Sequence, residues 1–282
     1  MAELLKGAPA ARALTERLRA ESDALRERGV IPTLAIVRVG ARDADLAYER
    51  GARKRCEQCG VAAQQIVLPE DADQASLLAA LAALNADAAV HGILLLRPLP
   101  PRFDDAAICA AVAPEKDVDG VTAASMAGIY ANSGALFAPC TASACIALLR
   151  HYGIPIDGKR AVVVGRSFVI GKPVSMLLLR ENATVSVAHT HTRDLPALCR
   201  EADILVVATG RMGLIGAAHV RPGQAVIDVG IHTAPAGGLR GDVRFDEVAP
   251  IVDAVTPVPG GVGAMTTAVL CEHVIRAAAG SA

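Results

Sequence analysis

This chain has few aromatic side chains and no excess of positive charge. Only 2% of the 282 residues are aromatic, there is no Trp, and the formal net charge is −1 at pH 7. Stacking platforms for single-stranded nucleic acid need aromatic rings, and surfaces that follow phosphate backbones or anionic membranes need clustered basic residues. We therefore expect no nucleic-acid or membrane partner, and an aliphatic core that supports small-molecule chemistry.

Long apolar runs are also absent. No apolar segment reaches the roughly 18 residues that a membrane-spanning helix needs. Residues 1–29 form an amphipathic pattern with charges throughout, and they lack the unbroken apolar segment of a signal peptide. We therefore predict a cytoplasmic protein, and we predict that its seven cysteines are reduced thiols.

Two of these cysteines, Cys56 and Cys59, have the CxxC spacing found in redox and metal sites. No second cysteine pair or nearby histidine cluster completes a zinc site around them. The alternative is that they are incidental cysteines on a helix, and this is the interpretation we adopt. We predict no metal site in the chain.

Apolar strand-like runs alternate with helical stretches in the first half of the chain. Strands are predicted at 33–40, 62–69 and 90–96, and helices at 43–60 and 74–85. This alternation is typical of βαβ units and a largely parallel sheet. The length suits two modest domains or one large α/β unit.

A second series follows the sequence Pro139-Cys140-Thr141. A helix is predicted up to about residue 152, followed by strands at 161–165, 184–188, 204–208 and 225–229, an order that fits a doubly wound nucleotide-binding fold. Residues 256–266 are too rich in proline and glycine for regular structure, so they are predicted to form an extended functional loop. Residues 266–279 should form a helix whose apolar face needs a partner.

Residues 161–173, AVVVGRSFVIGKP, take a buried strand directly into Gly165, Arg166 and Ser167, with a second glycine at Gly171. A βα turn of this kind presents backbone N–H groups and a helix N-terminus to phosphate. The glycine spacing departs from G-x-G-x-x-G, so the motif alone leaves an ordinary strand-to-helix connection as the alternative.

Several segments, taken together in their order and spacing, resemble the methylenetetrahydrofolate dehydrogenase/cyclohydrolase family, the FolD proteins. They are Tyr48 on a helix, GILLLRPLP (92–100), PEKDVDG (114–120), PCT (139–141), VVVGRSFVIGKP (162–173), ATG (208–210), DVGI (228–231), GDV (241–243) and TPVPGGVGAMT (256–266). The resemblance covers nearly the whole chain. PEKDVDG and PVPGGVG are its most specific parts.

The resemblance implies an α/β fold of two domains. Residues 1–139 and the C-terminal helix 262–282 would form the catalytic domain, and residues 140–261 a Rossmann-like, doubly wound domain that binds a nicotinamide cofactor. A folate substrate would lie in the cleft between them, where ligands are commonly found. The family resemblance also implies a homodimer.

On the cofactor side, the resemblance places Arg166 and Ser167 near the adenosine ribose and its 2′-phosphate. The planar guanidinium can neutralise that phosphate, which favours NADP, with NAD as the alternative; Arg166 would otherwise only solvate the turn. The implied cofactor-binding positions are Thr141, Gly165, Arg166, Ser167, Val169, Gly171, His189, Thr190, Ala208, Thr209, Gly210, Gly230 and Ile231.

On the substrate side, Asp119 matches the aspartate that hydrogen-bonds the pterin-like ring, because a carboxylate can accept two hydrogen bonds from an amino-pyrimidine edge. Its neighbour Asp117 is predicted to be structural and to cap the turn. In the 256–266 loop, glycines would let the backbone approach the substrate, or would serve the turn alone. The implied substrate-binding set is Tyr48, Leu96, Asp119, Pro259, Gly260 and Gly261, of which Tyr48 and Asp119 are the predicted catalytic residues.

Several positions depart from the family pattern, among them Asp45, Ala142, Ala144 and Ala264, and two of the departures bear directly on the chemistry. The family carries a lysine four residues after the helical tyrosine, where this chain has Ala52, and a glutamine where this chain has Leu96, followed by Arg97. Arg55 is the one nearby cation on the Tyr48 face of the helix. A guanidinium stays protonated and cannot act as a general base, so Arg55 would either bind an anion or lie in solvent.

The two reactions of the family make different demands on these positions. Hydride loss from a carbon between two nitrogens yields a delocalised cation and needs no base, so orienting the two rings suffices. Hydrolysis of that cation needs water activation and proton transfer by a tuned group, such as a buried lysine. Ala52 cannot provide this.

We therefore expect an NADP-dependent 5,10-methylenetetrahydrofolate dehydrogenase in which methenyltetrahydrofolate cyclohydrolase activity is lost or weakened. One alternative is an NAD(P)-dependent oxidoreductase that acts on a non-folate imine in a specialised pathway. Another is a non-catalytic cofactor-binding protein, although the cofactor-side motifs are intact.

Overall fold

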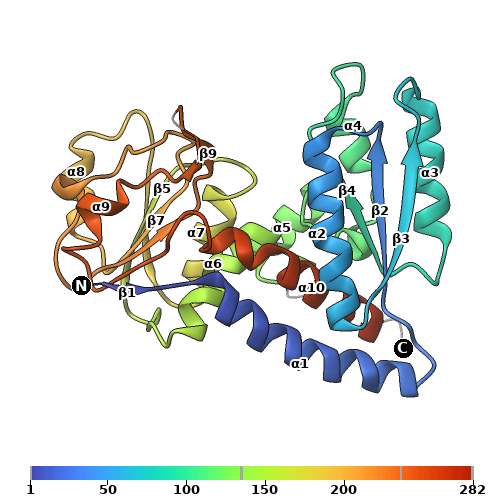
Figure 1. The fold of residues 1–282 in the computed structure, drawn as a ribbon, viewed down its shortest axis with the longest axis horizontal. Helices are drawn as coiled ribbons and strands as arrows, with labels where there is room; N and C mark the ends of the chain where they lie inside the picture. The colour runs from blue at the N-terminus through green and yellow to red at the C-terminus, as the bar shows by residue number, and fades with distance from the viewer. Residues whose placement is uncertain (1, 134–135, 236, 281–282) are drawn as a thin grey trace. The chain divides into compact units, whose positions relative to one another are not determined.

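Parallel strands form the main sheet in each of two units of the chain (Figure 1). The computed structural model describes residues 2–133, 136–235 and 237–280. Within that part of the chain, residues 13–140 and 267–280 form the three-stranded unit, and residues 2–12 and 141–266 form the six-stranded unit. These two names are used below.

The sheet of the three-stranded unit has the order β3 (Ala62–Leu68), β2 (Thr33–Val39) and β4 (Gly92–Leu95), all parallel. Along the central strand, Ala35, Val37 and Val39 join an aliphatic core with α3 (Gln74–Ala86) and α4 (Asp105–Ala110). The intervening residues of β2 point to the opposite face, because side chains alternate along a strand. The parallel βαβ pattern predicted for this half is confirmed.

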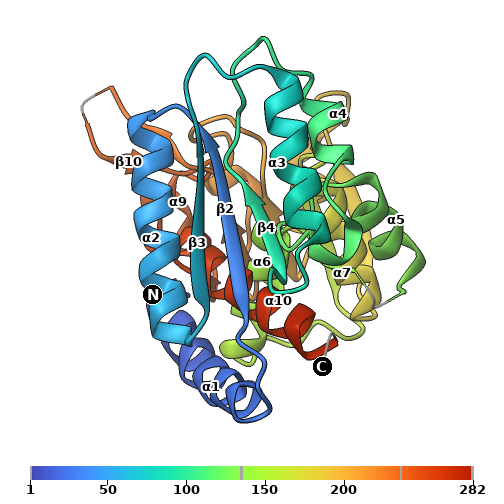
Figure 2. The ribbon, with the colours of Figure 1, turned by 90° about the vertical axis from the view of Figure 1, so that its right-hand side faces the viewer.

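On that opposite face lie α2 (Asp43–Cys59) and α10 (Thr266–Gly280), as Figures 1 and 2 show. The apolar face of α10 is buried, as the sequence required, and its Val274 packs beside Gly92 at the start of β4. An ion pair from Arg17 on α1 (Gly7–Glu27) to Glu272 joins the two helices at 2.5 Å. The C-terminal helix is therefore part of the three-stranded unit.

Buried and half-buried polar contacts fix α2 on the unit. The Arg38 guanidinium on β2 donates to the Glu49 carboxylate at 2.8 Å, with only 13% and 6% of the two side chains exposed. At the C-terminal end of the helix, the Gly60 carbonyl accepts a hydrogen bond from Ser22 Oγ at 2.9 Å. These contacts hold the helix that carries Tyr48.

The six-stranded unit has the strand order β1-β11-β8-β7-β5-β6, and every neighbouring pair is parallel. This order fits the doubly wound nucleotide fold predicted from the sequence. The strands are β1 (Glu3–Leu4), β5 (Arg160–Val164), β6 (Thr184–Ala188), β7 (Ile204–Val207), β8 (Ala225–Asp228) and β11 (Ala254–Val255). The helices are α6 (Cys140–His151), α7 (Gly171–Arg180), α8 (Leu195–Arg200) and α9 (Phe245–Val248).

The compact units differ from the predicted domains at two places. The first residues were expected in the catalytic domain, but residues 2–12 pack with the six-stranded unit because β1 pairs with β11. Likewise, residues 262–266 remain with the six-stranded unit, and only the chain from 267 onward joins the three-stranded unit.

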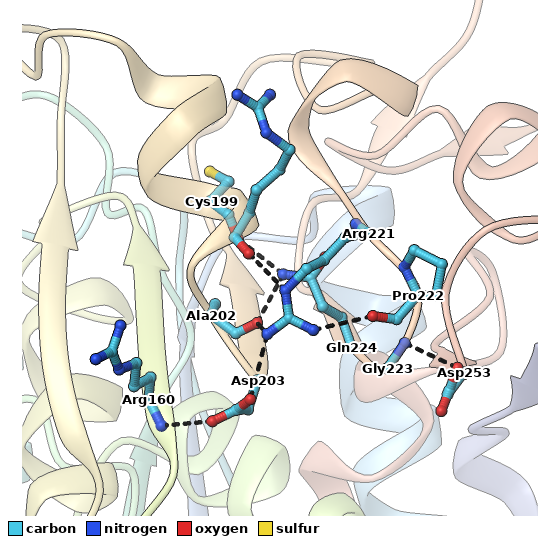
Figure 3. A network of polar contacts seen from close by, with 10 residues as sticks. Arg160, Cys199, Ala202, Asp203, Arg221, Pro222, Gly223, Gln224 and Asp253 are labelled. Atoms are coloured by element: carbon cyan, nitrogen blue, oxygen red, sulfur yellow. Dashed lines mark hydrogen bonds and ion pairs between the residues drawn. The ribbon is translucent and has the colours of Figure 1, made fainter.

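A polar network fixes the amino-terminal ends of three strands of the larger sheet (Figure 3). The Arg221 guanidinium donates to the carbonyls of Arg200 and Ala202, at 2.7 and 3.0 Å, and to the Asp203 carboxylate at 3.3 Å. The other oxygen of that carboxylate accepts the backbone N–H of Arg160, the first residue of β5. The loops predicted to bind a ligand lie at the opposite edge of the sheet, where the strands end.

Shorter elements complete the fold. They are α5 (Ala123–Ala131), the antiparallel pair β9 (His232–Thr233) and β10 (Leu239–Arg240), and 3-10 turns at Pro114–Lys116, Ala217–His219 and Val262–Ala264. The last of these corrects the prediction for 256–266, since the segment after its two prolines closes into a helical turn. Among the described residues, no helix is both long enough and apolar enough to cross a bilayer.

Candidate active site

The glycine turn after β5 is closed tightly onto a neighbouring loop. Gly165 has a φ of +126°, and a Cβ placed on it would lie 2.1 Å from the carbonyl oxygen of Ala208. A Cβ on Gly171, at the start of α7, would lie 2.2 Å from the Gly165 carbonyl oxygen. Because side chains are excluded at both positions, the backbone of the turn packs more closely than any residue other than glycine would allow.

The side chains of this turn divide into one that stabilises it and one that is open to solvent. Ser167 Oγ accepts the backbone N–H groups of Ile170 and Gly171 at 3.2 and 3.3 Å, so it organises the entry to α7. Arg166 is exposed and, within the part of the chain that the structure describes, has no hydrogen bond or ion pair. Val169 is also exposed, at 49%.

The residues predicted after β6 form a compact turn of their own. Thr192 Oγ1 accepts the backbone N–H of His189 at 2.8 Å, and the Nδ1 atom of His189 accepts the N–H of His191 at 3.1 Å. In the neutral ring, this bond places the His189 proton on Nε2. Thr190 is exposed. This turn and the Gly165 turn follow adjacent parallel strands, so they share the carboxyl edge of the sheet.

Asp242 ties together two further loops at this edge, a role that the sequence analysis missed. Its fully buried carboxylate accepts the backbone N–H groups of Thr209 and Gly210 at 2.5 and 3.0 Å, and His232 Nε2 at 2.6 Å. The motif GDV contains this aspartate, but the two backbone N–H groups that it accepts lie 33 and 32 residues away along the chain.

Asp228, at the end of β8, also binds backbone N–H groups of the loops at this edge. Its carboxylate accepts the backbone N–H groups of Gly230, Asp242 and Val243, each at 3.0 Å. Burial raises the pKa of Asp228 to about 6, although these hydrogen bonds favour the ionised form. Ile231, beside this loop, is 58% exposed. Thr141, the remaining predicted cofactor residue, is half-buried in the first turn of α6.

In the three-stranded unit, α2 presents Tyr48 with a methyl group one turn further on. Tyr48 is 39% exposed, whereas Ala52 is 1% exposed. Before Tyr48, Asp45 receives two hydrogen bonds from the guanidinium of Arg42, at 2.8 and 3.0 Å. Arg55 does not take the place of the missing lysine.

The Arg55 side chain is instead a link between helices. Its Nη1 donates to Thr15 Oγ1 on α1 at 2.9 Å and to Gln58 Oε1 at 3.1 Å. The expectation that Arg55 lies only in solvent is therefore wrong, and anion binding by Arg55 stays a prediction.

At the end of β4, Leu96 is buried at 5% exposure and its N–H donates to the Val37 carbonyl. The next residue, Arg97, forms a two-point ion pair with Asp105, in which its Nε lies 2.9 Å from Oδ1. The pKa of Arg97 is raised, first by this pairing and to a lesser extent by nearby Asp119.

The two aspartates of the PEKDVDG segment have different surroundings. Asp117 is fully buried and accepts the N–H groups of Val121 and Thr122 at 3.0 and 2.8 Å and the Ser125 hydroxyl at 2.6 Å. The prediction that Asp117 is structural is confirmed.

The Asp119 side chain is partly exposed to solvent, yet the surrounding protein raises its pKa to about 6. Burial is the main cause and the charge of Asp117 adds to it, whereas a hydrogen bond with the Cys140 thiol and the charge of Arg97 act in the opposite direction. The following Gly120 has a φ of +69°, and a Cβ there would lie 2.5 Å from the backbone nitrogen of Pro139. The loop that presents Asp119 is therefore closely packed.

The other predicted substrate residues belong to a different unit. Pro259, Gly260 and Gly261 lie in the six-stranded unit, where the Gly260 carbonyl accepts the N–H of Gly7 at 2.7 Å. Tyr48, Leu96 and Asp119 lie in the three-stranded unit.

Cys56 and Cys59 are buried in α2, and Cys56 Sγ lies 3.8 Å from the Cys271 thiol of α10. All seven cysteines are free and buried. Within residues 2–133, 136–235 and 237–280, no group of three or more His, Cys, Asp or Glu side chains is arranged to hold a metal ion.

Two family models together span most of the chain. The catalytic domain of tetrahydrofolate dehydrogenase/cyclohydrolase matches residues 5–119, and the NAD(P)-binding domain of the same family matches residues 139–282. The chain belongs to this family. The NAD(P)-binding model covers residues 141–266 of the six-stranded unit and also the part of the three-stranded unit from residue 267 onward, whereas the catalytic model covers residues 13–119 of the three-stranded unit and also residues 5–12 of the six-stranded unit.

Known FolD proteins match this chain over nearly its whole length. The bifunctional protein FolD of Carboxydothermus hydrogenoformans is 49% identical over 98% of this chain and 97% of its own. The crystal structure of the bifunctional enzyme FolD from Campylobacter jejuni has a TM-score of 0.96 at 37% identity and covers 99% of both chains. The Trypanosoma brucei FolD, solved with NADP and an inhibitor, has a TM-score of 0.91 at 35% identity and covers 99% of this chain and 98% of its own.

Proposed function

We propose that this FolD protein is an NADP-dependent 5,10-methylenetetrahydrofolate dehydrogenase with weak methenyltetrahydrofolate cyclohydrolase activity. Family membership over both units supports the dehydrogenase. One observation carries the imbalance between the two activities. The position one turn beyond Tyr48 holds a methyl group that is 1% exposed, and the nearest cation along that helix face, Arg55, is bound to Thr15.

NADP, when bound, accepts the hydride from the substrate. The chain's own contribution is to hold and orient the two rings, because the product cation is stabilised by its own nitrogen lone pair. Gly165, Ser167 and Gly171 support the close approach of a phosphate-bearing cofactor, since a Cβ at either glycine would meet backbone atoms and Ser167 Oγ organises the N–H groups at the start of α7. Around them, the proposed contacts are Thr141, Val169, His189, Thr190, the loop 208–210, Gly230 and Ile231.

The proposed role of Arg166 is to bind the 2′-phosphate that distinguishes NADP from NAD. Its guanidinium is exposed and free of partners among the described residues, so no internal ion pair must break. Replacing it, Arg166→Ala, should weaken NADP binding by about 10- to 100-fold, as expected for a lost charge-assisted contact, and leave NAD binding unchanged. Arg180→Ala, at the exposed end of α7, is the matched control.

On the substrate side, Asp119 is proposed to accept hydrogen bonds from the amino-pyrimidine edge of the folate. Its partly exposed carboxylate keeps acceptor capacity that the buried Asp117 has already used. Tyr48 and Leu96 are proposed to line the same site, and Pro259, Gly260 and Gly261 to contribute backbone. We also propose a cytoplasmic homodimer, which light scattering of the purified protein would test.

The deciding experiment measures NADPH formation with NADP or NAD, with and without methylenetetrahydrofolate, alongside hydrolysis of methenyltetrahydrofolate. We expect turnover that needs both NADP and the folate, with hydrolysis far slower than hydride transfer. Hydrolysis as fast as hydride transfer, and insensitive to Tyr48→Phe, would contradict the proposal. Cofactor binding without folate affinity would instead point to a non-folate imine substrate, and failure to bind NADPH to a non-catalytic protein.

A further inference from the structure

A histidine in the C-terminal helix is buried against the loop that carries Asp119. His273 is 3% exposed, and its Nδ1 lies 2.8 Å from the carbonyl oxygen of Val118. A carbonyl can only accept, so Nδ1 is the donor and carries the proton. Burial lowers the pKa of His273 to about 4, so the ring is neutral at physiological pH and this donor arrangement is retained.

The carbonyl that His273 holds belongs to the peptide bond between Val118 and Asp119. A planar peptide moves as one piece, so fixing its oxygen also fixes its nitrogen, and with it the direction in which the Asp119 side chain leaves the backbone. The Cys140 thiol donates to the same carbonyl at 3.4 Å. The backbone just before Asp119 is therefore held from two elements.

The surrounding packing leaves the imidazole little room to move. Its ring lies against Phe137, with centroids 4.9 Å apart and planes inclined by 31°. Below the loop, a Cβ on Gly92 would lie 2.8 Å from the Val118 methyl carbons and 3.1 Å from Val274. Strand β4, the loop and α10 are thus in contact where the hydrogen bond is made.

A side chain that only filled this space would not need a polar donor. Burying an imidazole costs free energy unless its polar atoms are satisfied. Here the imidazole donates to the carbonyl of Val118, one residue before Asp119, whose carboxylate we assign to substrate binding.

We propose that His273 is a positioning residue for Asp119, and that it sets the direction of the folate-binding carboxylate by holding the Val118 carbonyl through its Nδ1–H group. This inference rests on the proposed function for the identity of the ligand. It assigns His273 no contact with the substrate and no proton transfer.

The test compares two substitutions of His273 with a packing control on the same helix. His273→Leu keeps an apolar side chain but removes the donor, whereas His273→Asn keeps an N–H group close to the position of Nδ1. Ile275→Ala removes buried volume from α10 without removing a hydrogen bond to the loop. Circular dichroism and urea unfolding establish the folded fraction of each variant.

For His273→Leu we expect the KM for methylenetetrahydrofolate to rise about tenfold, the loss of one well-placed interaction, with kcat and the KM for NADP nearly unchanged. His273→Asn should return the folate KM to within about threefold of wild type, and Ile275→Ala should lower stability alone. The proposal is overturned if His273→Leu leaves the folate KM unchanged, if His273→Asn is no better than His273→Leu, or if Ile275→Ala raises the KM equally.

A second readout needs no substrate, so it separates this inference from the proposed function. In protein labelled with ¹³C at the aspartate carboxyl, the signal of Asp119 is assigned by its loss in Asp119→Asn. The charged or titratable groups around Asp119 include Asp117, Arg97, Cys140 and Cys109. His273→Leu should lower the pKa of Asp119 toward the ordinary value, because the released loop lets the carboxylate turn toward solvent, and His273→Asn should not. A wild type without folate turnover refutes the proposed function, whereas equal titrations in all variants refute the role of His273.

Discussion

In the six-stranded unit, the Asp228 carboxylate accepts three backbone N–H groups, whereas Asp119 in the three-stranded unit is partly exposed beside a thiol. Burial raises the pKa of both side chains to about 6. The acceptor capacity of Asp228 is used to shape loops, and that of Asp119 is available to a ligand. Similar electrostatics therefore accompany a structural role in one unit and a proposed binding role in the other.

The same contrast extends to the groups around each aspartate. At the carboxyl edge of the six-stranded sheet, Asp242 and Ser167 satisfy the backbone of the loops proposed to hold the cofactor. In the three-stranded unit, the Tyr48 face of α2 continues with a buried methyl at Ala52. We therefore propose that the cofactor side is complete and that the substrate side lacks an amine one turn beyond Tyr48.

The largest effect is expected from restoring that group with Ala52→Lys. An amine at this buried position would be partly desolvated, which lowers its pKa toward neutrality and lets it accept a proton. General acid–base catalysis contributes roughly 10²- to 10⁴-fold, so the rate of methenyltetrahydrofolate hydrolysis should rise by at least about 100-fold. Stopped-flow absorbance of the methenyl compound measures this rate.

Ala52→Met is the control, because it adds a chain of similar length without an amine. It should leave hydrolysis at the wild-type level. An equal gain from Met and Lys would mean that pocket shape, rather than a missing base, limits the reaction.

On the cofactor side, Gly165→Ala should abolish NADPH binding, with an affinity loss of at least about 100-fold. The added methyl meets the Ala208 carbonyl at 2.1 Å, and the φ of +126° is unfavourable for alanine. Strain and overpacking together should destabilise the unit by roughly 3 kcal/mol or more. Nicotinamide fluorescence and urea unfolding measure the two effects.

Gly51→Ala is the matched glycine control. It lies in α2, where the added methyl meets no atom within 4 Å, so helix propensity should raise stability by about 0.5–1 kcal/mol. A Gly165→Ala protein with normal NADPH affinity would show that the turn does not approach the cofactor.

A smaller effect is expected from pH at Asp119. The ionised carboxylate is the form that accepts hydrogen bonds from the substrate, and its pKa is about 6. The kcat/KM for methylenetetrahydrofolate should therefore fall up to tenfold per pH unit below pH 6, whereas NADPH binding should not follow this titration. Asp119→Asn should flatten this limb of the profile. A limb that persists in Asp119→Asn would assign the titration to another group.

Stability should change in the opposite direction with pH. The folded pKa of about 6 lies above the ordinary 3.8, so proton binding to Asp119 adds stability that is fully present below pH 3.8 and is lost as the pH rises through 6. At pH 8, Asp119→Asn should therefore raise the free energy of unfolding by about 1–2 kcal/mol, allowing for partial exposure. The two variants should unfold alike at pH 3.5.

Sequence patterns were sufficient where the physical signal is local. The strand at 184–188 is found at its predicted bounds, because a short run of high β-propensity is bounded by turn residues. The two-residue strand β1 carries no such pattern, so its pairing with β11 could not be predicted. Asp242 was missed for a related reason, since the N–H groups it accepts lie 33 and 32 residues away and only the fold brings them together.

The smallest effect is expected at Arg55, which lies on the helix of Tyr48 but contacts Thr15 and Gln58. Arg55→Ala removes hydrogen bonds between half-buried and exposed groups, so it should lower the free energy of unfolding by about 1 kcal/mol. Arg55→Gln, which can still donate to Thr15, should recover part of this loss. The KM for the folate should stay within twofold of wild type in both variants, because Nη1 of the guanidinium is directed to Thr15 on α1 and to Gln58. A KM that rises severalfold in Arg55→Ala, with stability unchanged, would return Arg55 to the substrate side and remove one support for the missing-base explanation.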